Sequence, residues 1–107
     1  LKKEVFKVVF LNSQNRIIAI EDLEEGTVNH AAPIIREIFQ RALQHFAVSI
    51  ICVHNHPSGD AKPSQEDQIF TQKLKESGQV LGVKIIDHII LGNGRYFSFT
   101  DDRNIPA

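Results

Sequence analysis

The chain has 107 residues, of which 42% are apolar and 23% charged, and its formal net charge is -1 at pH 7. These values indicate one soluble globular domain with one core, and the nearly balanced charge gives no reason to expect a nucleic-acid or acidic-membrane partner. The single cysteine, Cys52, excludes an intrachain disulfide and a cysteine-rich zinc finger, and it fits a cytoplasmic location.

Membrane and export signals are missing from this sequence. No apolar run approaches the ~20 residues that span a bilayer, so we expect no membrane partner. The N-terminal residues lack the apolar core of a signal peptide. Because the chain contains no methionine, we expect it to be a domain excised from a longer protein.

The first half of the chain predicts a hairpin followed by a helix. Apolar residues at 5–11 and 16–20 predict two strands around a polar turn. The acidic stretch 21–25, with Glu21, Glu24 and Glu25, is interpreted as a solvated turn. Apolar residues at helical spacing over 34–46 predict an amphipathic helix with Pro33 in its first turn. We expect the flanking residues His30 and His45 to be solvated.

The second half begins with a short apolar run at 48–53, which predicts a buried central strand. A Pro/Gly-rich loop follows, and Ser64 with Asp67 three residues later predicts a helix N-cap and first turn. That helix is expected to fade near Gly78. Strands are predicted at 83–91 and 96–100 around an Asn-Gly turn, with a frayed polar tail at 101–107. The order β-β-α-β-α-β-β predicts a mixed sheet with helices packed on it, in the α/β or α+β class.

Three residues around the central loop form a candidate metal site. His54 and His56 are two apart at a strand end, so both imidazoles can point to the same side. Asp67, in the first turn of the next helix, can supply a carboxylate. Two histidines and one carboxylate leave a fourth tetrahedral position for water, which is typical of a catalytic Zn2+ site. The same ligands could hold non-haem iron. A loop followed by a helix cap would explain Pro57, Gly59, Pro63 and the Ser64–Asp67 pair without any metal. It would leave the two histidines unexplained.

The spacing His54-x-His56, seven residues, Ser64, two residues, Asp67 matches the JAMM metalloprotease motif. The segment HNHPSGDAKPSQED resembles the RadC branch of that family, and so do DHIILGNGRYFSF at 87–99 and GTVN followed by PIIREIF at 26–39. The resemblance covers nearly the whole chain. It implies a zinc hydrolase-like domain over residues 1–107 with the JAB1/MPN fold, a cytidine-deaminase-like sandwich. RadC proteins usually carry a helix-hairpin-helix region before this domain.

The resemblance also implies an upstream glutamate that acts as general acid/base through the zinc-bound water. Among Glu4, Glu21, Glu24 and Glu25 we favour Glu4, because it opens the first predicted strand. Zinc-activated water would then attack an amide carbonyl of a peptide or protein substrate. Ser64 would donate a hydrogen bond to the developing oxyanion, in competition with its role as N-cap.

Two alternatives to hydrolysis stay open. The domain could be a DNA-repair-associated accessory module, or its metal site could be structural or regulatory. Direct DNA binding by this fragment is disfavoured because the only local positive cluster is Lys62, Lys73 and Lys75. We expect Cys52 to be a core thiol. For His88 we favour a structural histidine, with a place near the cleft as the alternative. The sequence does not indicate an oligomeric state.

Overall fold

The computed structural model describes residues 4–23 and 31–106. Its elements are the strands β1 (Phe6–Leu11) and β2 (Ile17–Leu23), the helix α1 (Ala31–Gln44), the strand β3 (Ser49–Asn55), the helix α2 (Gln65–Leu81), and the strands β4 (Lys84–Leu91), β5 (Arg95–Ser98) and β6 (Arg103–Pro106). The six strands form one mixed sheet in the order β2-β1-β3-β4-β5-β6. Only β3 and β4 run parallel, because α2 connects them as a crossover. The predicted α/β class is therefore confirmed.

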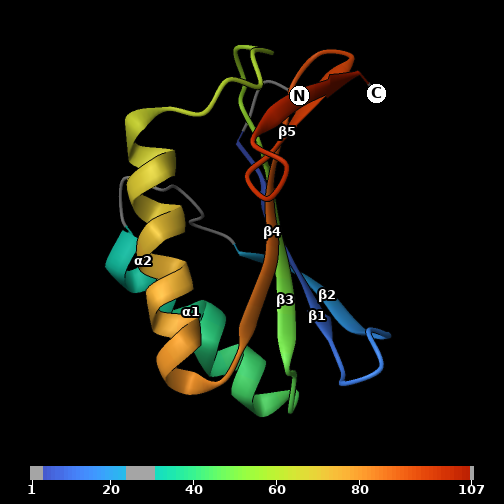
Figure 1. The fold of residues 1–107 in the computed structure, drawn as a ribbon, viewed down its shortest axis with the longest axis vertical. Helices are drawn as coiled ribbons and strands as arrows, with labels where there is room; N and C mark the ends of the chain where they lie inside the picture. Colours follow the sequence, from blue (N-terminus) through green and yellow to red (C-terminus); the bar gives the residue numbers. More distant parts are fainter. Residues whose placement is uncertain (1–3, 24–30, 107) are drawn as a thin grey trace.

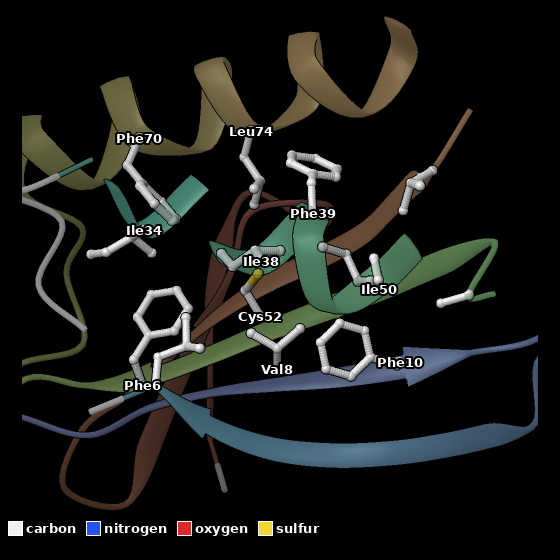
Figure 2. Packing of buried hydrophobic residues seen from close by; sticks show 14 residues of the cluster. Phe6, Val8, Phe10, Ile34, Ile38, Phe39, Ile50, Cys52, Phe70 and Leu74 are labelled. Atoms are coloured by element: carbon white, nitrogen blue, oxygen red, sulfur yellow. The ribbon is translucent and has the colours of Figure 1, made fainter. Parts of the chain in front are cut away.

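The described part of the domain has two layers. Both helices lie on the same face of the sheet, and the other face carries no helix (Figure 1). Alternate residues of β1 and β3 point toward the helices and are fully buried, as a strand period of two requires. Figure 2 shows how they pack against apolar side chains of α1 and α2; the labelled residues are Phe6, Val8, Phe10, Ile34, Ile38, Phe39, Ile50, Cys52, Phe70 and Leu74.

Cys52 lies in this core with no exposed surface, as the sequence predicts. Burial raises the pKa of its thiol far above the ordinary value. The side chain is therefore a neutral core thiol and not a nucleophile.

Three sequence interpretations are wrong. The tail is not frayed, because Arg103–Pro106 forms β6 and pairs antiparallel with β5. The second strand does not end at residue 20: Glu21 is part of β2, where it lies opposite Val8 and forms ion pairs with Arg41 at 3.4 Å and His45 at 3.2 Å. His45 is consequently half-buried and not solvated. Glu24, Glu25 and His30 lie outside the described residues.

The second helix also extends beyond the predicted end at Gly78. It continues to Leu81 and ends at Gly82, whose φ of 74° is the left-handed conformation that glycine favours at a helix end. Gly78 is buried, and a Cβ there would overlap the Val83 carbonyl oxygen. Its glycine therefore permits the close approach of the chain that enters β4, rather than ending the helix.

Candidate metal centre

The strand β3 holds the first predicted ligand in a fixed place. It lies between β1 and β4, and His54 pairs with Phe6 on one side and Ile90 on the other. The His54 ring is 1% exposed and stacks on the Phe6 ring, with 5.5 Å between centroids and 7° between planes. Because His54 has the same parity as Ile50 and Cys52, it faces the helices.

The loop after β3 and the start of α2 place the other two predicted ligands at the same end of the sheet. Ser64 is the N-cap of α2, and its Oγ accepts a hydrogen bond from the Asp67 backbone N–H at 3.0 Å. The Asp67 Oδ2 in turn accepts from the Ser64 backbone N–H at 2.8 Å, which completes a capping box. His56 donates from Nδ1 to the backbone carbonyl of Asp60 at 2.8 Å, since a carbonyl can only accept.

The three side chains converge. One potential ligand atom from each of His54, His56 and Asp67 lies within 4.8 Å of the others. His54 Nε2 is 3.3 Å from Asp67 Oδ1, and His56 Nε2 is 2.9 Å from Asp67 Oδ2. Asp67 is 0% exposed although it carries a carboxylate. The structure therefore brings together the residues that the sequence singles out.

Two atoms of this group indicate that it fits a cation. His54 Nε2 and Asp67 Oδ1 are buried, and neither has a hydrogen-bond partner among the described residues. A buried polar atom without a partner costs about 1–3 kcal/mol. A cation between these two atoms would satisfy both, and the His/His/Asp donor set suits zinc, iron or another divalent transition metal.

The charge state of the group suits a cation as well. Burial alone would raise the pKa of Asp67, but the neighbouring His54 side chain and the hydrogen bonds from Ser64 hold that pKa below its ordinary value. Asp67 is thus ionised at neutral pH. The group offers one negative charge and two imidazole nitrogens.

Ser64 and Glu4, the other two predicted site residues, do not belong to the converging group of three side chains. Ser64 is beside Asp67 as its capping partner. Glu4 is half-buried just before β1 and is not a member of the converging group among the described residues. Its backbone is nearby, because β1 runs antiparallel to β3 and the Val5 N–H donates to Asn55 Oδ1 at 2.6 Å. Continuing that pairing puts Glu4 at the level of His56, with the parity of Phe6, which faces the helices.

His88 contacts a candidate ligand through a hydrogen bond that the sequence analysis did not identify. It is 0% exposed, and its Nε2 is 2.8 Å from His54 Nδ1. Its Nδ1 is 2.6 Å from Thr71 Oγ1. Burial, assisted by the nearby His54, lowers the pKa of His88 to about 3, so the ring is neutral. The structural role predicted for His88 is confirmed, but its partner is a candidate ligand. Only the parallel pairing of β3 with β4, which sets Cys52 opposite His88, reveals this contact.

Two histidines at the end of a central strand and an aspartate in the first turn of the next helix, on a mixed sheet with two helices, define a domain of the JAB/MPN class. The chain belongs to the RadC-like JAB domain family, which it matches over residues 1–105. The resemblance drawn from the motif is thereby confirmed.

Relatives of the chain are bacterial and archaeal proteins named UPF0758. The chain is 50% identical over 101 residues to one from Caldanaerobacter subterraneus, 48% over 102 residues to one from Clostridioides difficile, and 46% over 101 residues to one from Methanosarcina mazei. The aligned segments cover 94%, 95% and 94% of this chain but 43%, 43% and 44% of those proteins. The chain thus spans less than half the length of these relatives. Within the described residues, neither helix is long and apolar enough to cross a membrane.

Proposed function

We propose that this chain is a zinc-dependent hydrolase domain that cleaves an amide bond of a peptide or protein substrate. The supporting observation is the pair of buried atoms, His54 Nε2 and Asp67 Oδ1, which face each other at 3.3 Å without a hydrogen bond. With His56 Nε2 they form a three-donor set. Such a set, with an open fourth position, is typical of catalytic zinc. When bound, the ion supplies Lewis-acid activation of water and of the scissile carbonyl.

The Ser64 hydroxyl is suited to the oxyanion of the reaction. Its oxygen is occupied as the acceptor of the Asp67 N–H, at 3.0 Å. An accepting hydroxyl keeps its own proton, and this proton can be donated to a second group. Capping and oxyanion stabilisation therefore use different parts of one hydroxyl and do not compete. The half-buried N-cap also places Ser64 next to the proposed ligand Asp67.

We assign the proton transfer to Glu4. A general acid/base must lie within hydrogen-bond reach of the reacting water and leaving nitrogen. The assignment is supported by the register of β1 with β3, which begins at Phe6 opposite His54, because Glu4 precedes Phe6 by two residues.

Metal analysis and a cleavage assay test this function together. The 107-residue chain, stripped with a chelator and reloaded, is expected to bind one zinc ion per chain and to cleave members of a quenched-fluorescence peptide library. His54→Ala and Asp67→Asn should lose both properties. His45→Ala is the matched control, because it removes a histidine that is paired with Glu21 outside the metal group.

The outcomes separate the open alternatives. A chain that binds no zinc contradicts the whole proposal. Zinc binding without cleavage of any peptide would favour the accessory-module alternative. Salt-dependent binding of duplex DNA would revive a role for the exposed lysines Lys62, Lys73 and Lys75.

A further inference from the structure

A chain of hydrogen bonds runs behind His54 and returns to Asp67. His54 Nδ1 lies 2.8 Å from His88 Nε2, and His88 Nδ1 lies 2.6 Å from Thr71 Oγ1. Thr71 Oγ1 lies 2.8 Å from the backbone carbonyl oxygen of Asp67. His54, His88, Thr71 and Asp67 are all buried, so water does not compete for these contacts. The two residues at the ends of this series of hydrogen bonds, His54 and Asp67, are proposed metal ligands.

The donor and acceptor of each hydrogen bond in this series follow from the last acceptor, the backbone carbonyl oxygen of Asp67. A carbonyl oxygen has no proton, so Thr71 must donate its single hydroxyl proton to Asp67. The Thr71 oxygen can then only accept from His88, which places the proton of neutral His88 on Nδ1. His88 Nε2 is left as a lone pair and accepts from the His54 Nδ1–H. An imidazole ring that carries a single proton, here on Nδ1, presents Nε2 as a lone pair.

The opposite direction is disfavoured by the same geometry. It would require Thr71 to donate to His88 and would leave the hydroxyl oxygen 2.8 Å from a carbonyl oxygen with no proton between them. Two acceptors at that distance repel. For the metal-binding part of the proposal it has a further consequence, because it would put a proton on His54 Nε2 and a protonated nitrogen cannot bind a metal.

We propose that His88 and Thr71 are positioning residues that fix His54 in the Nδ1–H tautomer and so direct its Nε2 lone pair toward the metal. The metal part of this proposal rests on the proposed function, whereas the tautomer part does not. The Nδ1–H of His56 donates directly to the Asp60 carbonyl, and a cation bound to both atoms would offset the repulsion between His56 Nε2 and Asp67 Oδ2, which are 2.9 Å apart.

The core holds the His88 ring in the orientation that this role needs. Phe99 stacks on it with 4.8 Å between centroids and 9° between planes. Phe70 meets it edge-on at 5.6 Å and 66°. Metal-binding histidines usually donate their other N–H to a carboxylate, a carbonyl or water. A neutral histidine serves here without adding a second buried negative charge to that of Asp67.

Nitrogen NMR of the wild-type chain tests the tautomer without any substitution. In the zinc-free, 15N-labelled chain at neutral pH, His88 is expected to carry its proton on Nδ1, with the nitrogen shift of a lone pair at Nε2. An Nε2–H tautomer at His88 would overturn the proposal. This measurement gives an answer even if the chain binds no metal.

Zinc affinity, measured by competition with a chromophoric chelator, tests the consequence for binding. His88→Phe keeps an aromatic ring in the core but removes the acceptor, and it is expected to weaken zinc binding roughly 10–100-fold. Thr71→Val should weaken binding in the same direction, whereas Thr71→Ser, which keeps the hydroxyl, should restore wild-type affinity. His45→Ala is the control, because it removes a histidine outside this series of hydrogen bonds and should keep wild-type zinc affinity.

The results distinguish this proposal from the previous one. Failure of the wild-type chain to bind zinc would defeat the proposed function and leave the tautomer to the NMR measurement. Wild-type zinc affinity in both Thr71→Val and His88→Phe would overturn the positioning role alone. If His88→Phe does not fold, the Thr71→Val and Thr71→Ser pair still decides the question.

Discussion

Substitution of Ser64 separates a role in stability from a role in catalysis. Ser64→Ala removes the Oγ that accepts the Asp67 N–H at 3.0 Å. The reverse half of the capping box survives, because the Ser64 backbone N–H that reaches Asp67 Oδ2 at 2.8 Å does not depend on the side chain. Loss of an N-cap side chain costs about 0.5–2 kcal/mol, and retention of half the box favours about 1 kcal/mol. For a chain of this size the expected fall in Tm is about 4 °C.

Two further variants make the separation clean. Ser64→Gly also lacks the hydroxyl, but glycine at an N-cap costs only a few tenths of a kcal/mol. Ser64→Thr keeps both the acceptor and the donor. Thermal unfolding of the zinc-free chain should therefore rank wild type above Thr and Gly, and both of these above Ala. Cleavage by the zinc-loaded chain should rank wild type and Thr well above both Gly and Ala, by roughly 100–1000-fold if the hydroxyl stabilises the oxyanion.

The two rankings can fail independently. An alanine variant as stable as wild type would refute the capping energy assigned to Ser64. A glycine variant that cleaves peptide at the wild-type rate would refute the oxyanion role, whatever its Tm.

Three other predictions use different parts of the structure. Glu4→Gln should lower peptide cleavage at least 100-fold with zinc affinity unchanged, since a general acid/base contributes about 10²–10⁴-fold without being a ligand; weakened zinc binding would instead make Glu4 a ligand. In urea unfolding of the zinc-free chain, stability should fall as pH is lowered from about 6.5 to about 3, because the unfolded chain protonates His88 near ~6.5 whereas burial holds the folded pKa at about 3. The free energy of unfolding should change by about 1.4 kcal/mol per pH unit because of His88. Asp67, whose pKa is also lowered, should reduce stability further below pH ~3.9. A free energy of unfolding that does not change with pH would contradict both contributions. Gly78→Ala should destabilise the chain by about 1–2 kcal/mol in the same assay, because overlap with the Val83 carbonyl oxygen outweighs the ~1 kcal/mol helix gain; a more stable variant would show that β4 can shift.

The candidate ligands could be predicted because their signals are local. His54 and His56 lie at the end of a short apolar run that predicts a strand, and Asp67 occupies the N3 position of a recognisable helix start. Strand end and helix start are joined by a short turn-rich loop, so the two must meet. Chain connectivity therefore brings these three side chains together without knowledge of the rest of the sheet.

The errors occur where the signal is tertiary or weak. β6 is an edge strand whose residues are mostly exposed, so its sequence has no apolar alternation to read. Glu21 belongs to a residue type that is depleted in strands, and it is accommodated because Arg41 pairs with it at 3.4 Å and His45 Nε2 lies 3.2 Å from it. His88 lies in an unremarkable strand sequence. Its link to His54 depends on which strand lies beside β3, and the sequence does not specify that neighbour.

Side chains along β3 point alternately to the two faces of the sheet, so core residues and a candidate metal ligand depend on the same register. Ile50, Cys52 and His54 all face the helices, at 0%, 0% and 1% exposure, whereas the residues between them face the open side of the sheet. Inserting or deleting one residue within β3 would reverse every side chain beyond that point. Such a length change would empty the core and carry His54 to the opposite face in one event. The strand can therefore accept substitutions one at a time, but its length is fixed, and insertions should be tolerated instead at the exposed turn of residues 12–15.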